Sequence, residues 1–269
     1  MLLTQKNEVV MSSDYILSAL KNTVLIISIL FLSWILIALI LQILSNYIRT
    51  KLAKILGIKF YIYVTAIGVM IHELGHLFFC IVFRHKINEV KLFSPQTDGT
   101  LGYVSHSYNP RNLYHKIGNF FIGTGPIWGG LIAMFFCSYW LNPYIFLYFN
   151  DGYFAFLKSI FSTSFIMRWE SWLWLYIIIS IISHITLSPP DLAGAKDGFI
   201  AICITVLASC LLLGKLGDWE AKILSYGLNI LHIALPFIIL FIILSVFLAL
   251  ILKIIENSIN KKNRFNNEL

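Results

Sequence analysis

The chain has 269 residues, of which 58% are hydrophobic and 12% are charged. A soluble domain carries about twice that charged fraction, so the composition excludes an ordinary soluble protein. The net charge of +7 fits loops that face an anionic leaflet of a membrane. No arginine-rich stripe with interleaved aromatics lies outside the apolar runs. We therefore expect the lipid bilayer as a partner, and no nucleic acid.

Long uncharged runs divide the sequence. A helix that crosses a bilayer needs about 20 mostly apolar residues. The runs predict an all-α membrane protein with about six transmembrane helices, at 23–45, 61–83, 118–140, 172–189, 199–214 and 231–252. The aromatic and aliphatic stretch 141–165 is either a re-entrant piece or a seventh span. Cys80, Cys137, Cys203 and Cys210 all fall within these spans without C-x-x-C spacing, which indicates packing residues rather than disulfides or ligands.

The second span contains His72-Glu73-Leu74-Gly75-His76, an H-E-x-x-H sequence. On a helix the two histidines lie on one side and can share a tetrahedral zinc ion, while Glu73 is placed to activate a zinc-bound water. Such residues inside a membrane helix cost several kcal/mol unless they are paired or bind a metal. Neutral histidines packed in a polar bundle interior are the alternative, but they leave the carboxylate at this spacing unexplained.

A polar segment, 84–117, separates the second and third spans. Two β-prone runs, 89–93 and 101–106, flank a turn that contains Pro95 and Asp98-Gly99. This pattern predicts a small β-hairpin; the alternative is an ordinary loop. The domain organisation that we expect is an N-terminal segment with the first span (1–60), a core (61–200), and C-terminal spans with a polar tail (201–269). The tail 255–269 is rich in Asn and Lys, which predicts disorder.

A catalytic zinc needs a third protein ligand. The best candidate is Asp191, which follows Pro189 and Pro190 at the predicted C-terminal end of the fourth span. The second and fourth spans run in the same direction, so Asp191 and His76 should approach the same face, and the prolines should free the backbone to turn the carboxylate inward. The alternatives are Asp197 as ligand, His184 as ligand or as a hydrogen-bond donor to a ligand carboxylate, and an Asp191 that faces headgroups.

The remaining ionisable residues fit a metal site less well. We expect Glu170 and Glu220 at the opposite membrane face and Glu256 in the tail. His85, His106 and His115 should be solvated, and His232 should lie at the membrane interface. If the N-terminus is cytoplasmic, the inner segments hold 12 of the 20 basic residues, which predicts that the site lies toward the cytoplasm. We expect a multi-pass protein of a bacterial cell membrane. The sequence leaves the oligomeric state open.

These residues together resemble the site-2 protease family of intramembrane zinc metalloproteases. In that family an H-E-x-x-H helix is followed by a β-region, a Gly-Pro element and an aspartate, which here match His72–His76, 88–107, Gly125-Pro126 and Asp191 in order over 61–200. The first and last spans are additions. The chain looks like a divergent member, because two features of the family are altered.

The first alteration concerns an asparagine that in the family helps to bind the substrate backbone. Gly129 or Gly130 stands at its place here, and Asn119 or Thr124 are the possible substitutes. The second concerns the aspartate, which the family follows with glycine. Asp191 is followed by leucine, and Asp197-Gly198 matches that dipeptide better.

The resemblance implies an endopeptidase that hydrolyses a peptide bond of a membrane protein or peptide within or near the membrane. An edge strand of the hairpin would hold the unwound substrate by main-chain pairing. The alternatives are a membrane protease that trims soluble or lipidated peptides, usually with a glutamate as third ligand; a zinc-binding or proton-carrying transporter or regulator; and a catalytically silent scaffold. Glu73 distinguishes a protease from a transporter, because a transporter has no need of a base beside two metal ligands.

Overall fold

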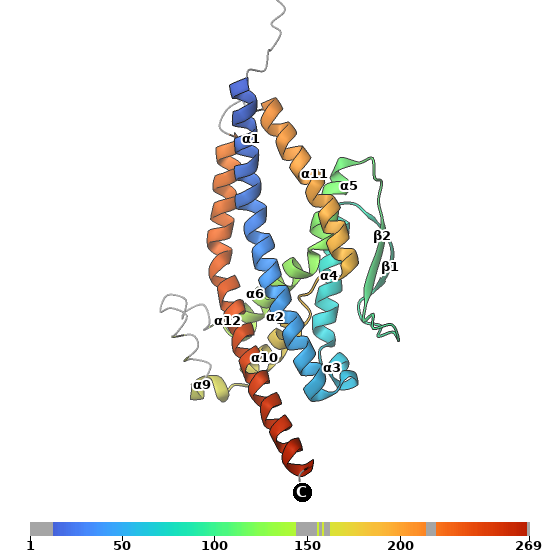
Figure 1. The fold of residues 1–269 in the computed structure, drawn as a ribbon, viewed down its shortest axis with the longest axis vertical. Coiled ribbons are helices and arrows are strands. Elements are labelled where there is room, and N and C mark those ends of the chain that lie inside the picture. The colour runs from blue at the N-terminus through green and yellow to red at the C-terminus, as the bar shows by residue number, and fades with distance from the viewer. Residues whose placement is uncertain (1–12, 144–154, 156–157, 159–161, 214–218, 268–269) are drawn as a thin grey trace, which may run out of the picture.

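The computed structural model describes residues 13–143, 155, 158, 162–213 and 219–267. It is an elongated helical bundle with a two-stranded hairpin on one flank (Figure 1). The N-terminal part comprises α1 (Ser13–Ile27), the π-helical turn η1 (Ser28–Leu32), α2 (Ser33–Leu56), α3 (Ile58–Val64) and α4 (Ala66–Val82). The rest comprises β1 (Lys86–Lys91), β2 (Tyr103–Ser107), α5 (Leu113–Gly123), α6 (Gly125–Leu141), α9 (Thr163–Ile166), α10 (Trp169–Ile182), α11 (Pro189–Leu213) and α12 (Trp219–Asn267).

The described residues form an all-α membrane protein, but not one with six spans. Three helices are long and apolar enough to cross a membrane: Tyr15–Leu56, Pro189–Leu212 and Trp219–Lys261. Two helix pairs pass the same test only if each counts as one span. They are α3 with α4, which are bent by 60°, and α5 with α6, which are bent by 58°. The number of candidate spans is therefore three to five.

The fourth predicted span, 172–189, is the one that fails. Its helix, α10, has 14 residues and is about 21 Å long, whereas the hydrocarbon core is about 30 Å thick. Residues 183–188 carry no Asp, Glu, Lys or Arg and so extend the uncharged run, but they leave the helix. The fifth predicted span, 199–214, begins too late, because α11 starts at Pro189 and includes the charged residues Lys196 and Asp197.

The predicted disorder of the tail 255–269 is also wrong for its described part, because α12 continues to Asn267. Glu256 holds this helix to the end of α2, where Lys51 lies 2.5 Å and Lys54 2.7 Å from its carboxylate oxygens. The possible seventh span, 141–165, lies mostly outside the described residues.

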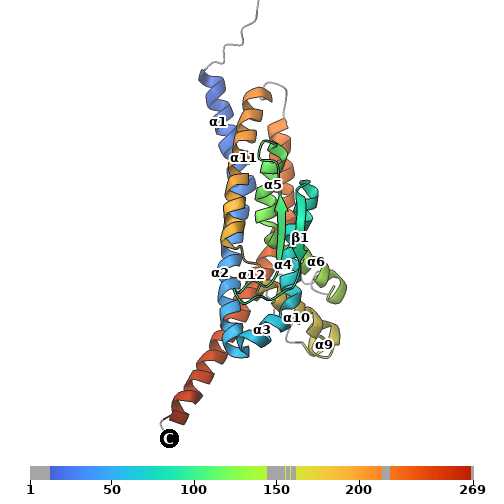
Figure 2. The ribbon, with the colours of Figure 1, turned by 90° about the vertical axis from the view of Figure 1, so that its right-hand side faces the viewer.

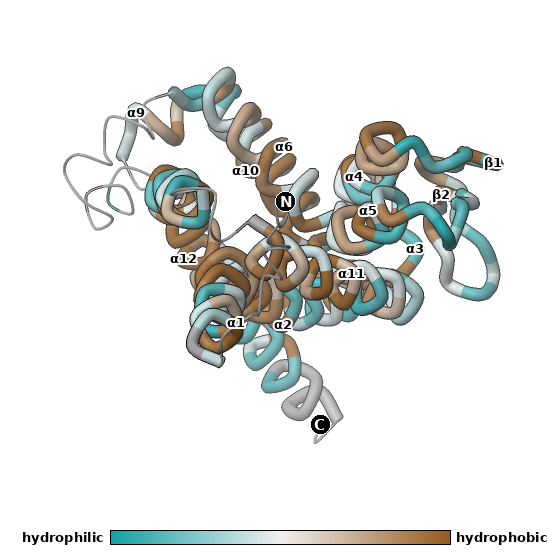
Figure 3. Tube along the Cα trace, turned by 90° about the horizontal axis from the view of Figure 1, so that it is seen from above, coloured by the Kyte–Doolittle hydropathy of each residue, from teal (hydrophilic) through white to brown (hydrophobic). Residues whose placement is uncertain are grey.

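The hairpin between α4 and α5 is confirmed. β1 and β2 pair antiparallel, with Val90 opposite Val104 and a bulge between Ile87 and Glu89. The turn contains Gly99 at a φ of 93°, a conformation that favours glycine. The hairpin lies beside α4 and α5 (Figure 2) and is largely hydrophilic, whereas much of the bundle is apolar (Figure 3).

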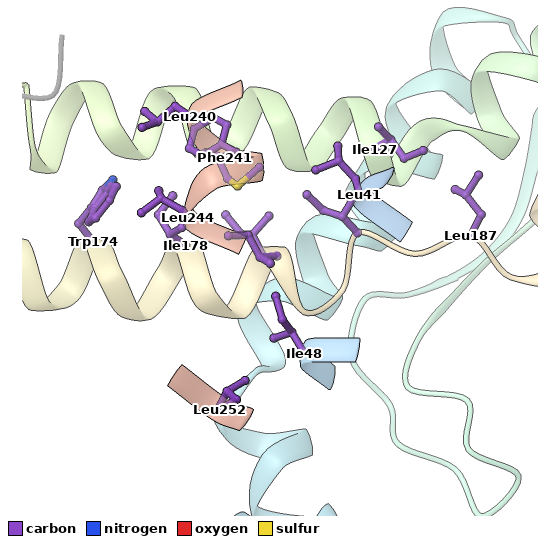
Figure 4. Close-up of a cluster of buried hydrophobic side chains, with 14 of the residues drawn as sticks. Leu41, Ile48, Ile127, Trp174, Ile178, Leu187, Leu240, Phe241, Leu244 and Leu252 are labelled. Atoms are coloured by element: carbon purple, nitrogen blue, oxygen red, sulfur yellow. The ribbon is translucent and has the colours of Figure 1, made fainter. Parts of the chain in front are cut away.

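The main apolar core lies where α2, α6, α10 and α12 meet (Figure 4). Trp174 is fully buried there and donates from Nε1 to the Ser138 hydroxyl of α6 at 2.9 Å. Helix α4 packs against α6 and α10, two of the helices that this core holds together.

Candidate metal centre

Helix α4 carries His72, Glu73 and His76 on its inner side. Glu73 and His76 are buried, and His72 is half-buried. The helix ends in a Schellman motif, in which His85 donates its N–H to the carbonyl of Cys80 at 2.9 Å, and Arg84 has a φ of 55°. The imidazoles of His72 and His76 therefore lie on the same side of the helix, as their i, i+4 spacing predicts.

Asp191 lies with the two histidines, but for a reason other than the predicted one. It belongs to the first turn of α11 rather than to the end of a preceding span, and Pro189 and Pro190 begin that helix instead of interrupting one. Ser188 and Asp191 form a capping box: the Ser188 N–H and hydroxyl donate to Asp191 Oδ2 at 2.8 and 2.7 Å. This leaves Oδ1, 3.4 Å from His76 Nε2.

The non-helical segment after α10 orients His72. His72 donates from Nδ1 to the backbone carbonyl of His184 at 2.9 Å. The His184 ring lies 2.8 Å from the Thr65 hydroxyl and 3.2 Å from the Tyr61 hydroxyl. His184 is therefore outside the ligand group, and it acts through its main chain rather than as a donor to a carboxylate.

The break between α5 and α6 orients His76 in the same way. His76 donates from Nδ1 to the Ile122 carbonyl at 2.8 Å. In a continuous helix this carbonyl would accept from residue 126, but residue 126 is a proline and has no N–H. The Gly125-Pro126 element thus leaves an acceptor free for the histidine ring.

Three acceptor atoms converge between these elements. His72, His76 and Asp191 each offer one ligand atom, all within 4.8 Å of one another, and Asp197 is outside this group. Since both Nδ1 atoms donate to carbonyls, both Nε2 atoms of the neutral rings carry lone pairs, and they lie 3.3 Å apart. Two lone pairs and a carboxylate repel one another unless a cation lies between them, so the group can hold a metal ion.

A cavity of about 820 Å³ opens at this group. Its wall includes Glu73, whose carboxylate makes no hydrogen bond within the described part of the chain. The chain just before β2 approaches Glu73 closely because residue 102 is glycine: a Cβ there would lie 2.8 Å from the Cγ of Glu73. The carboxylate is therefore held beside the metal ligands and faces a space large enough for a peptide segment.

The possible substitutes for the family's asparagine differ in what they contact. The Thr124 hydroxyl donates to the Phe120 carbonyl at 2.7 Å and accepts from Trp128 Nε1 at 3.0 Å. Asn119 is 6% exposed and lines the cavity, and its side chain has no hydrogen-bond partner among the described residues. Asn119 is thus the amide available to a bound molecule.

Other predicted placements have mixed outcomes. Glu220 contacts Asn22, Glu170 lies 3.6 Å from Arg168, and neither lines the cavity. The expectation that His85, His106 and His115 are solvated is wrong for His85, which is 5% exposed. His106 and His115 are half-buried. Sequence reasoning missed the two carbonyls that orient the ligand rings. Pro126, four residues after Ile122, is the signal for one of them.

Comparison with known proteins adds no relative. No protein-family model, no curated protein and no solved structure matches this chain.

Proposed function

We propose that this protein is a zinc metalloprotease that hydrolyses a peptide bond within or near the membrane. The observation that carries this proposal is the convergence of two oriented imidazole Nε2 atoms and a carboxylate beside the free carboxylate of Glu73. Zinc–nitrogen bonds of about 2.0–2.1 Å at a tetrahedral angle place two ligand atoms about 3.3 Å apart. Two of the three separations here are 3.3 and 3.4 Å, and all three are within 4.8 Å, so the donor set fits zinc in chemistry and, at His76, also in spacing.

His72, His76 and Asp191 would hold the zinc ion. When bound, zinc supplies a Lewis acid that acidifies water and polarises a carbonyl. Glu73 accepts the proton of the attacking water and delivers it to the leaving amine. Asn119 donates its side-chain N–H to a substrate carbonyl, because it is the buried amide of the cavity that has no partner in the described part of the chain.

The substrate that fits this cavity is an extended segment. Residues 99–104 of the hairpin line the cavity on the side of Glu73, where a strand offers main-chain groups to an unwound helix. Deletion of the turn 94–101 should therefore lower cleavage of a single-span reporter while zinc remains bound. Unchanged cleavage would remove the hairpin from the mechanism.

The decisive experiment is Glu73→Gln in the full chain, reconstituted in vesicles with a single-span reporter. Glu73→Gln should bind zinc as the wild type does and lose cleavage by at least about 100-fold, the scale of a general base. Glu170→Gln, a carboxylate away from the cavity, is the matched control. Cleavage retained by Glu73→Gln would refute the proposal, and zinc transport retained without cleavage would favour the transporter.

Metal content tests the ligands separately from catalysis. Zinc should be lost in His72→Ala and Asp191→Ala and kept in Asp197→Ala, which changes a carboxylate that lines the cavity outside the ligand group. A chelator should lower the melting temperature of the wild type but not of Asp191→Ala, because only a protein that binds the ion is stabilised by it. Full zinc in Asp191→Ala would overturn the ligand assignment.

A further inference from the structure

Strand β2 presents an imidazole to the cavity. Alternate residues of the strand and its flanks lie on one face, and Gly102, Val104, His106 and Tyr108 all line the cavity that contains Glu73 and His76. Gly102 lies against Glu73, and Val104 is apolar. His106 is thus the imidazole that this strand adds to the wall beyond the ligand group.

The neighbouring His85 fixes the protonation of His106. His85 lies between the end of α4 and β1. Its Nε2 lies 3.0 Å from the His115 carbonyl and its Nδ1 lies 3.1 Å from Nδ1 of His106. A carbonyl only accepts, so Nε2 of His85 carries the proton and Nδ1 carries a lone pair. Nδ1 of His106 must then be the donor to His85.

Both rings are held neutral. Burial lowers the pKa of His85 below its ordinary value. Burial also lowers the pKa of His106, and the neighbouring His85 and His76 rings lower it further. A neutral His106 that carries its proton on Nδ1 has a lone pair on Nε2, and no residue of the described part of the chain donates to that atom.

We propose that His106 is a specificity-determining residue, whose Nε2 accepts a hydrogen bond from a side-chain N–H or O–H of the bound substrate. His85 is the positioning residue that selects this tautomer, and Tyr108 stacks on the His85 ring at an interplanar angle of 15°. The inference rests on the proposed peptide substrate. It names the substrate class: extended segments with a serine, threonine or amide side chain a few residues from the scissile bond.

The position of that side chain follows from the strand. His106 is four residues from Gly102, the residue that lies against Glu73, and a strand rises about 3.3 Å per residue. The contact is therefore made about 13 Å along β2 from the base. That separation places His106 away from Glu73, so its loss should affect affinity and leave the proton transfer by Glu73 intact.

The first test needs no activity. Two-bond proton–nitrogen correlation spectra of the full, zinc-loaded chain with 15N-labelled histidine should show His106 protonated on Nδ1. His85→Phe keeps an aromatic ring for Tyr108 to stack on but removes the acceptor, and should shift His106 toward protonation on Nε2. A wild-type His106 protonated on Nε2 overturns the proposal.

The second test measures recognition with the non-cleaving Glu73→Gln chain. The probes are fluorescent ten-residue alanine-based peptides that carry one threonine, or the isosteric valine, at successive positions. One position should bind about three- to tenfold more tightly with threonine, the range of one neutral hydrogen bond. His106→Phe should abolish this difference, and His232→Phe, an exposed histidine of α12, should keep it.

Three outcomes contradict the proposal. Threonine and valine peptides bind equally at every position; the preference survives in His106→Phe; or the wild type binds two zinc ions and His106→Phe only one, which would make the His85–His106 pair a metal site. If no reporter is cleaved but both tests succeed, the protease proposal fails and His106 stands as a ligand-binding residue.

Discussion

Replacing Pro126 with alanine tests how the helix break orients the metal ligand. Pro126 is fully buried and lacks the N–H that would otherwise bond to the Ile122 carbonyl. The substituted alanine supplies this N–H, so that α5 and α6 can continue as one helix and compete with His76 for the carbonyl, which His76 now contacts at 2.8 Å. Loss of such an orienting partner lowers metal affinity about 10- to 100-fold, which is about 1.4–2.8 kcal/mol.

The assay is a zinc titration of the full chain against a competing chelator, with the helical circular dichroism signal as a check on folding. Pro236→Ala is the matched control, because Pro236 lies inside α12 away from the metal group. Its zinc affinity should equal that of the wild type. A folded Pro126→Ala chain with wild-type affinity would refute the idea that the proline acts through the Ile122 carbonyl.

Three further predictions concern the elements around the site. Ser188→Ala removes the hydroxyl bond to Asp191 and the cap of α11. It should lower the free energy of unfolding by about 0.5–2 kcal/mol, measured by thermal unfolding, and should also lower zinc affinity, measured by chelator titration. Gly75→Ala places a Cβ 2.7 Å from the Gly125 carbonyl carbon, so it should force α4 from α6 and destabilise by about 1–3 kcal/mol; an unchanged melting temperature contradicts that close packing. Arg84→Gly relieves the positive φ at the end of α4 and should raise stability by about 1 kcal/mol; a lower melting temperature would show that the Arg84 side chain matters more.

The ligand-bearing helix could be predicted because its signal is local. His72 and His76 need only helical periodicity to face the same side, and Glu73 lies next to the first of them. Asp191 joins the two histidines as predicted, but it lies in the first turn of a helix rather than at the end of one. The sequence Ser188-Pro189-Pro190-Asp191 has the features of a helix start, which are a capping serine, proline in the first turn and an acidic third residue. Its position after a long apolar run favours a helix end instead, and the structure shows that the capping signal is the stronger one.

The span count failed because hydropathy measures an apolar run and not a helix. The run 172–189 has the composition of a span, yet its helix stops at Ile182. Conversely, α11 begins among polar residues such as Asp197, which lines the cavity, so a search for uncharged runs starts the helix too late. The burial of His85 could not be predicted from the sequence either, because it depends on how the hairpin folds over α4.

The break between α5 and α6 and the metal ligand His76 stabilise each other. A backbone carbonyl without a partner costs several kcal/mol in an apolar surrounding, so breaks inside a membrane bundle need compensation. The His76 ring donates to the carbonyl of Ile122, whereas the carbonyl of His184 accepts both from the His72 ring and from the Thr186 N–H; each carbonyl directs an Nε2 atom toward the metal. Removing the His76 ring therefore removes a ligand and also takes the side-chain donor from the Ile122 carbonyl. Asparagine separates the two effects, because its side-chain N–H can replace Nδ1–H while no atom replaces Nε2. His76→Asn should thus lose zinc yet remain more stable than His76→Ala, an order that would be reversed or absent if the carbonyl contact were incidental.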